Sequence, residues 1–350
     1  MKYPIYLLAV AIFISRLSAN AQKTDGIEYI VNAGEYKLSL PERSFFNDSK
    51  LPFKKIVVYD YRFDSSKIGY LETGTGLSYN NKIQLKENWS IVLNNYFKEN
   101  LDNSSESTLV VFIKSFWMQE GIIDEITTKK VIRKPAFTNS DASGNCKAQL
   151  DVYIQSDSTL QPFFQIDGSF LNFYKFKPNK LGEWFYLPFD SMAQKIIPAD
   201  IASLVAKKKK LTFNEVISYY NKRFDLPILK TDLLTKGIYI TFEDFKNNKP
   251  LVTDFRLEKG KLTDELYVGQ NGNETLLTDY WGFSDGKDIF MKVGFNIYKS
   301  IRQQNSFEVF GGKHISNHHN NSSPNDLIKI NYMSVDRKIL HLNMETGRFN

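Results

Sequence analysis

The chain contains 350 residues, carries a formal net charge of +6 at neutral pH and has one cysteine, Cys146. This length is enough for two domains with hydrophobic cores of their own. A lone cysteine excludes an internal disulfide framework, and we interpret Cys146 as a small residue in a core or at a strand end. The 27 Phe and 19 Tyr residues are interleaved with β-branched residues and indicate a sheet-rich protein.

The first 21 residues have the pattern of an export signal. Lys2 precedes an apolar run at 3–14, and residues 19–21 supply the small-x-small sequence that signal peptidase recognises. The apolar run is shorter than the roughly 20 residues that span a bilayer. We therefore predict cleavage between Ala21 and Gln22.

The predicted mature chain has 329 residues and is expected to be exported, either periplasmic or extracellular. No later segment is apolar for long enough to form a membrane helix, so no membrane span is expected after the signal is removed. Cys146 lies too far from the cleavage site to be the acylated cysteine of a lipoprotein. Lys2 and Arg16 leave with the signal, which lowers the net charge from +6 to +4.

One concentration of positive charge is evident, the four lysines at 207–210. Such a run can hold nucleic acid or anionic lipid, but no aromatic platform accompanies it. We interpret it as a solvated linker or helix end and expect no nucleic-acid partner.

Residues 22–53 predict an extended lead-in, because short apolar pieces alternate there with polar interruptions. Residues 54–206 predict an α/β sandwich domain, in which two helices cover one face of a small sheet. Its first strand is expected at 55–63, followed by a turn-like stretch with several glycines. Apolar residues at helical spacing then predict a helix over 85–101.

The remaining elements of this domain are strands and one interrupted helix. The run 107–117 is apolar on both faces and indicates a buried strand. Residues 147–155 and 161–170 alternate in polarity and predict a hairpin joined by a short polar turn. A second helical pattern over 192–205 contains Pro198, which we expect to kink or restart the helix.

Residues 207–350 predict a helix followed by a β-rich antiparallel domain, so the overall fold class is α+β. Thr212 can cap the helix and Glu215 can close a capping box, with the helix stopping before Pro227. Asn271-Gly272 and Asp285-Gly286 are strong turn signals between strands. The predicted strand runs are 237–242, 265–269, 288–294, 295–301, 307–312, 327–333 and 338–344.

Three of the four histidines cluster at 314, 318 and 319. The spacing of His314 and His318 would place both rings on one helical face, as in zinc sites. The surrounding Gly, Asn and Ser residues predict a polar loop instead, and no glutamate lies where a zinc protease needs its base. We predict no metal site there, and at most weak adventitious binding.

Carboxylates offer a second candidate set. Asp60 and Asp64 flank Arg62 at the end of the first predicted strand, and Glu120, Asp124 and Glu125 follow the strand at 107–117. A glycosidase needs two carboxylates about 5–10 Å apart across a cleft. We interpret Asp60 and Arg62 as a local ion pair. Asp64-Ser65-Ser66 is interpreted as a turn, because no G-x-S-x-G motif accompanies it.

Aromatic residues gather between 170 and 184. A surface that stacks on sugars or contacts a protein is one interpretation, and packing in a core or between domains is the other. The residues concerned are Phe170, Phe173, Tyr174, Phe176 and Trp184.

Two stretches resemble known exported proteins. KKIVVYDYRFDSSKIGY and the helix after it resemble the opening of small α/β domains in bacterial envelope accessory proteins, of the curli-secretion and penicillin-binding-protein-activator type. GIYITFEDFKNNKP, YWGFSDGKDIFMKVG and LHLNMETGRF resemble a pattern in exported two-domain proteins of unknown function from Gram-negative bacteria. Neither resemblance implies a catalytic, cofactor-binding or metal-binding residue.

The sequence therefore favours an exported, non-catalytic envelope or secreted protein that binds another envelope component, either a protein or a glycan. No cofactor is expected. Two alternatives stay open: a hydrolase acting on polysaccharide or envelope polymer, and a carbohydrate-binding module that uses the aromatic residues at 170–184.

Overall fold

The computed structural model describes residues 33–42, 44–45, 48–73, 79–120, 144–172, 181–258, 264–269, 273–294, 296–318 and 332–350. The predicted signal, with its cleavage between Ala21 and Gln22, lies outside these residues. Within them, no helix has the length and apolar character needed to cross a membrane.

The chain divides into two compact units. The α/β unit comprises residues 34–232 together with 302–306 and 342–350, and the β unit comprises 233–301 and 307–341. The predicted boundary after residue 206 is not confirmed, because residues 207–232 belong to the α/β unit.

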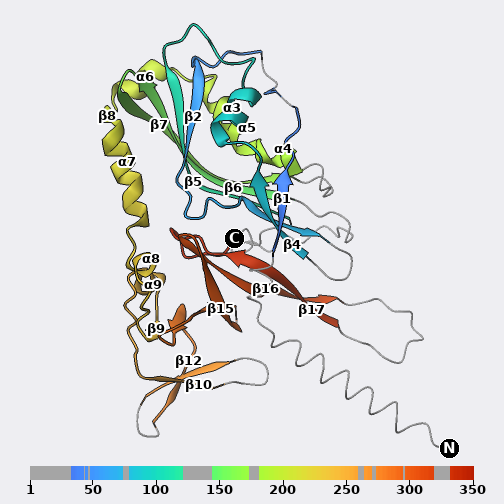
Figure 1. The fold of residues 1–350 in the computed structure, drawn as a ribbon, viewed down its shortest axis with the longest axis vertical. Coiled ribbons are helices and arrows are strands. Elements are labelled where there is room, and N and C mark those ends of the chain that lie inside the picture. The colour runs from blue at the N-terminus through green and yellow to red at the C-terminus, as the bar shows by residue number, and fades with distance from the viewer. Residues whose placement is uncertain are drawn as a thin grey trace, which may run out of the picture. The chain divides into compact units, whose positions relative to one another are not determined.

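The α/β unit is built on a mixed sheet in the order β1-β4-β3-β5-β6-β7-β8, with β2 paired to β5 as well (Figure 1). Strands β2 and β3 both run parallel to β5 and pair with successive parts of it. The predicted hairpin is confirmed, since β6 and β7 are antiparallel and Ser156 pairs with Thr159. The strands are β1 (Gly34–Leu38), β2 (Lys55–Asp60), β3 (Gly69–Thr73), β4 (Tyr79–Leu85), β5 (Thr108–Glu120), β6 (Gly144–Ser156), β7 (Thr159–Asn172) and β8 (Leu211–Thr212).

Helices cover both faces of this sheet, where the sequence predicted one covered face. One face packs with α3, α4 and α5 in the larger core, which includes the buried Cys146. On the opposite face, Val216 and Tyr220 of α7 pack against Val110 and Phe112 of β5. Figure 1 shows α3 and α5 on one side of the sheet and α7 on the other. The helices are α3 (Trp89–Tyr96), α4 (Leu181–Phe185), α5 (Leu187–Ile196), α6 (Ile201–Ala206), α7 (Phe213–Asn221), the 3-10 helix η3 (Lys222–Phe224) and α8 (Pro227–Lys230).

Several helix boundaries follow local signals. Thr212 caps α7 in a complete capping box with Glu215, as predicted. Pro198 lies between α5 and α6, which confirms the predicted restart. The helix predicted over 85–101 is shorter: Leu85 ends β4, and Asn88 caps α3 by accepting a hydrogen bond from the Ile91 amide. An asparagine N-cap outweighs the continuing apolar pattern, because it satisfies an amide that the helix leaves unpaired.

The lead-in and the glycine-rich stretch contain more structure than predicted. Strand β1 lies within the predicted lead-in and pairs with β4 in parallel, and Leu51 and Phe53 are buried in the core. Strand β3 begins at Gly69, where the sequence predicted a turn. An added Cβ there would lie 1.9 Å from the Met118 carbonyl oxygen, so glycine permits the close approach of β3 to β5.

The β unit contains a sheet in the order β17-β16-β15-β14-β13-β9 and a separate antiparallel sheet of β10, β11 and β12. The predicted antiparallel, β-rich character of this part is confirmed. Ile238, Leu266, Tyr280 and Phe283 form its buried cluster. Its elements are β9 (Gly237–Tyr239), α9 (Phe242–Lys246), β10 (Phe255–Glu258), β11 (Glu265–Val268), β12 (Thr275–Leu277), β13 (Gly282–Ser284), β14 (Ile289–Val293), β15 (Asn296–Gln303), β16 (Ser306–His318) and β17 (Tyr332–His341).

Two expectations for the β unit are wrong. The strand predicted at 237–242 ends at Tyr239, because Thr241 and Asp244 form a capping box that starts α9. Residues 313–318, predicted as a polar loop, continue β16 beyond the predicted strand at 307–312, and β16 pairs with β17. Backbone pairing with β17 supports strand structure there despite the polar composition. The Asp285-Gly286 turn is confirmed between β13 and β14, whereas Asn271-Gly272 lies outside the described residues.

The C-terminal residues 342–350 form a small loop within the α/β unit. Leu342 and Met344 are buried, and Leu342 bridges to Phe349. Asn343 Oδ1 accepts hydrogen bonds from the amides of Glu345 and Thr346, which closes the turn.

Candidate functional site

A polar cleft of about 400 Å³ lies beside the end of β2 and contains Asp60, the first acid of the candidate set. The side chains of Asp60, Arg62 and Trp89 meet there. Arg62 donates to both carboxylate oxygens of Asp60, at 2.8 and 2.6 Å, and the Trp89 indole donates to the same carboxylate at 3.2 Å. The predicted local ion pair is confirmed, and its bidentate geometry is the strong form of this interaction.

Arg62 also fixes the loop that follows β2. Its guanidinium donates to the backbone carbonyls of Ser65 and Lys67 and lies 5.4 Å from the centre of the Trp89 ring. The side chain is 5 % exposed. Four donor contacts and near-complete burial make Arg62 a structural clamp in this loop.

The predicted turn at Asp64 is confirmed and contains a partner that sequence reasoning missed. Asp64 Oδ1 accepts hydrogen bonds from the Ser66 amide at 2.9 Å and the Ser66 hydroxyl at 2.6 Å. Its other oxygen pairs with Lys67, and both side chains are fully buried. A carboxylate neutralised by a buried ammonium is a weak base, so this arrangement does not activate Ser66. The spacing of three residues between Asp64 and Lys67 is the sequence feature that could have predicted this ion pair.

The remaining acids of the candidate set are not among the side chains that the structure describes. Asp124 and Glu125 lie outside the described residues, as does the side chain of Glu120. The cleft contains a different acid, Glu87, which is exposed and has no partner among the residues that the structure describes. Of the candidate acids, the described chain therefore contains the side chains of Asp60 and Asp64, and each is held in an ion pair.

His314 and His318 do not share a helical face, the arrangement considered for them in a zinc site. His314 and His318 lie on β16, where four residues span about 13 Å of strand instead of one helical turn. His319 lies outside the described residues. His341 is buried in β17 opposite Glu308, with Nδ1 3.2 Å from a carboxylate oxygen of that residue.

The aromatic stretch at 170–184 contributes to the core where it is described. Trp184 is 1 % exposed and Phe170 packs against the larger core. The interpretation as core packing is confirmed for these two residues, and Trp184 is not available to stack on a sugar. Residues 173–180 lie outside the described chain.

Helix α7 is held on the sheet by a buried polar network beneath it. Tyr220 donates to Asp151 of β6 at 2.6 Å, the Tyr153 and Tyr220 hydroxyls are 3.3 Å apart, and Lys114 lies 3.1 Å from the second Asp151 oxygen. The Tyr220 ring stacks on Phe112 at 4.3 Å. Burial and the bond to Asp151 raise the pKa of Tyr220 far above its ordinary value.

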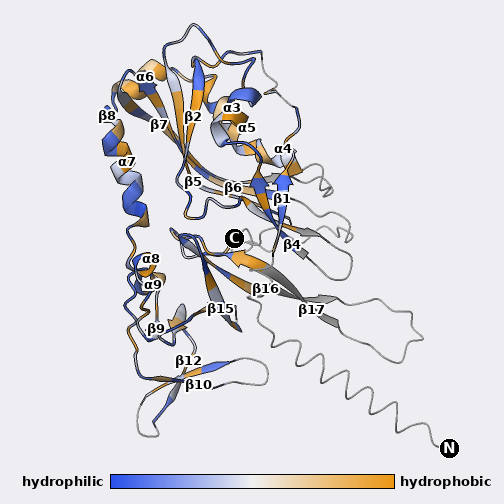
Figure 2. Ribbon diagram, viewed as in Figure 1, coloured by the Kyte–Doolittle hydropathy of each residue, from blue (hydrophilic) through white to orange (hydrophobic). Residues whose placement is uncertain are grey.

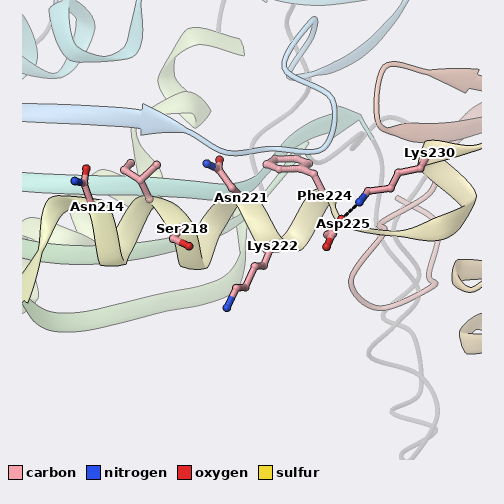
Figure 3. A pocket seen from close by; sticks show the side chains of 8 residues that line it. Asn214, Ser218, Asn221, Lys222, Phe224, Asp225 and Lys230 are labelled. Atoms are coloured by element: carbon pink, nitrogen blue, oxygen red, sulfur yellow. Dashed lines mark ion pairs between the residues drawn. The ribbon is translucent and has the colours of Figure 1, made fainter.

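The outer side of α7 and α8 forms an open groove of about 660 Å³ (Figure 3). Ile217 and Phe224 are its half-buried apolar residues, and an ion pair between Asp225 and Lys230 lies at one end. We call this surface the α7 groove, defined by Asn214, Ile217, Ser218, Asn221, Lys222, Phe224, Asp225 and Lys230.

Three polar, uncharged side chains of the α7 groove are open to a ligand. Asn214, Ser218 and Asn221 are exposed, and no hydrogen bond of their side chains occurs within the described structure. Figure 3 shows Asn214 and Asn221 projecting from the same side of α7, as a spacing of seven residues requires. Sequence reasoning identified the apolar stripe of this helix and passed over the polar positions between its members.

The chain's positive charge is concentrated beside this groove. Residues 207–230 contain seven Lys or Arg and two acids, a net charge of +5, against +4 for the whole predicted mature chain. Lys207 is the C-cap of α6, which confirms the predicted helix end. Within the described chain, Lys209 pairs with Glu215, whereas Lys210 and Lys222 have no ion-pair partner.

Comparisons of the chain with protein-family models, with curated proteins and with solved structures give no match.

Proposed function

We propose that this chain is an exported, non-catalytic protein that binds another component of the cell envelope through the α7 groove. The observation that carries the proposal is the contrast between its two polar sites. Asp60 in the cleft and Asp64 in the loop after β2 are neutralised by Arg62 and Lys67, whereas Asn214, Ser218 and Asn221 in the groove are open. Paired carboxylates fix a loop, and unpaired amides and hydroxyls on a rigid helix are available for recognition.

Location outside the cytoplasm is supported by the export pattern at residues 1–21. A rigid position for the groove is supported by the contacts under α7, where Val216 and Tyr220 are buried against the sheet. Tyr219, which follows the groove residue Ser218 on the same helix, is 59 % exposed and offers an amphipathic ring to solvent.

Photo-cross-linking in the native cell tests this proposal. A photoreactive residue at Tyr219 is expected to give a discrete adduct with an envelope component, detected by a mobility shift and identified by mass spectrometry. The matched control is the same residue at Lys98, which is exposed on the loop after α3. Equal adducts from both positions, or none from Tyr219, would contradict the proposal.

Activity assays test the non-catalytic part separately. The purified chain is expected not to hydrolyse polysaccharide, peptide or ester substrates. The acids that line the cleft in the described chain are Asp60 and Glu87. Turnover that disappears in Asp60→Asn or Glu87→Gln would favour the hydrolase instead.

A further inference from the structure

We propose that the ligand of the α7 groove is a carboxylated polysaccharide, an inference that rests on the proposed function. Its first support is charge complementarity. Lys210 and Lys222 lie on either side of α7 along the chain, are exposed and have no ion-pair partner within the described structure. The net charge of +5 over 207–230, of which Arg223 is paired with Glu345, favours an anionic ligand, and carboxylates spaced along a polymer supply negative charge without burying it.

The second support is the set of uncharged groups between these lysines. The carboxamides of Asn214 and Asn221 each donate and accept, and the hydroxyl of Ser218 does both. Sugar hydroxyls also donate and accept, and they occur on every ring of a polysaccharide. Each of these three side chains can therefore hydrogen-bond to hydroxyls of a polysaccharide. The polymer need not bind with one particular sugar ring opposite each side chain.

The third support is the apolar lining. Ile217 and Phe224 are half-buried in the groove, and Tyr219, the residue after the groove residue Ser218, is exposed. Amphipathic and apolar side chains of this kind cover the C–H faces of a ring whose hydroxyls bind polar neighbours.

An extended acidic peptide fits this surface less well. One edge of an extended chain presents its backbone groups every two residues, about 6.7 Å apart. Asn214 and Asn221 are separated by about 10.5 Å along the helix axis, which is not a multiple of that repeat. The two carboxamides therefore cannot both meet equivalent groups of one extended backbone.

A lipid surface fits less well too. An interfacial helix buries a broad apolar face in the headgroup region. The apolar face of α7 is already buried, since Val216 and Tyr220 pack on the sheet. The large hydrophobic residues that α7 leaves exposed are Phe213 and Tyr219.

The test is fluorescence anisotropy with the purified full chain and labelled polymers. The two carboxylated probes are polygalacturonate and hyaluronate. The comparison probes are neutral dextran, poly-L-glutamate and phosphatidylglycerol vesicles. Binding is expected for a carboxylated polysaccharide, absent for dextran and weaker for poly-L-glutamate and vesicles.

Paired variants separate charge from hydrogen bonding. Lys210→Gln with Lys222→Gln is expected to weaken binding about tenfold and to reduce its salt dependence. Asn214→Ala with Asn221→Ala is expected to weaken polysaccharide binding about fivefold and to leave poly-L-glutamate binding unchanged.

The matched controls remove the same groups elsewhere on the α/β unit. They are Lys86→Gln with Lys98→Gln and Asn95→Ala with Asn103→Ala, all at exposed positions. Both controls are expected to bind as the wild type does.

Three results would overturn the inference: no binding of either carboxylated polysaccharide, equal or tighter binding of poly-L-glutamate or vesicles, or no effect of the asparagine variants. A discrete Tyr219 adduct with an envelope protein under any of these results would leave the proposed function standing. Loss of that adduct as well would remove both.

Discussion

Tyr220 shows how one side chain ties a helix to a sheet. Its ring stacks on Phe112, and its hydroxyl donates to Asp151, which also pairs with Lys114. The buried hydroxyl must stay protonated, because burial and the neighbouring carboxylate both oppose a phenolate, and the pKa of Tyr220 is raised. The attachment of the α7 groove to its scaffold therefore depends on the protonation state of one buried residue.

This residue predicts an alkaline limit to stability. Above pH 10 the unfolded chain loses the Tyr220 proton while the folded chain retains it, so the free energy of unfolding falls as the pH rises. Tyr220→Phe is expected to make this fall shallower by about 1.4 kcal/mol per pH unit between pH 10 and 12. Urea unfolding over that range measures the slope.

Tyr239 provides the control, because burial raises its pKa to about 12 and it lies in the β unit. Tyr239→Phe is also expected to make the fall shallower, but its effect should fade as the pH approaches 12, where the folded chain begins to lose the Tyr239 proton, whereas the effect of Tyr220→Phe persists. An unchanged slope in Tyr220→Phe would mean that Tyr220 ionises in the folded chain.

At the scale of elements, helix α3 satisfies the outer edge of strand β2. Asn94 accepts from the Ile56 amide at 2.9 Å and donates to the Ile56 carbonyl at 2.6 Å, while Ser90 accepts from the Val58 amide at 2.8 Å. Edge strands with free backbone groups recruit other strands. The polar side chains of α3 therefore hydrogen-bond to the backbone groups on the edge of β2 that does not pair with β5.

Asn94→Ala is expected to lower the free energy of unfolding by about 1–3 kcal/mol, because it leaves two partly buried backbone groups unpaired. The exposed edge is also expected to promote self-association, visible as earlier elution in size-exclusion chromatography. Asn95→Ala removes the same group from the exposed side of the helix and is expected to change neither quantity. Equal behaviour of the two variants would contradict the role of Asn94.

At the scale of the whole molecule, the end of the chain completes the α/β unit. Arg223, just after α7, donates to Glu345 at 2.6 Å and to the carbonyl oxygens of Tyr61 and Lys114. Lys114 lies at the irregularity in the pairing of β5 with β6, and a bulge of this kind leaves backbone groups without a strand partner. Residues 342–350 thus contribute buried side chains and an ion pair to the α/β unit, whose strands lie far earlier in the sequence.

A chain that ends at residue 341 lacks Leu342 and Met344, whose apolar side chains are buried on folding. Its free energy of unfolding is expected to be lower by about 3 kcal/mol or more. Thermal unfolding followed by tryptophan fluorescence measures the loss, since the buried Trp89 and Trp184 report on the α/β unit. Removal of Asn350 alone is expected to have little effect. Equal melting of all three chains would show that 342–350 is dispensable.

The amino-acid pattern predicted most elements whose signal is local. The hairpin of β6 and β7, the restart at Pro198, the capping box of Thr212 and Glu215, and the ion pair of Asp60 with Arg62 each involve residues close in sequence. Neighbouring residues meet whatever the rest of the chain does, so their chemistry can be predicted directly.

The tertiary structure decided which surfaces these elements cover. The run 107–117 is apolar on both faces, which required cover on both sides, but only the folded chain shows that α7 supplies the second cover. The same contact exposes Asn214, Ser218 and Asn221 on the outer side of α7 and sets the charge of 207–230 beside them. Burial of one helical face against a distant strand determines which face remains for a ligand, and sequence spacing does not encode that choice.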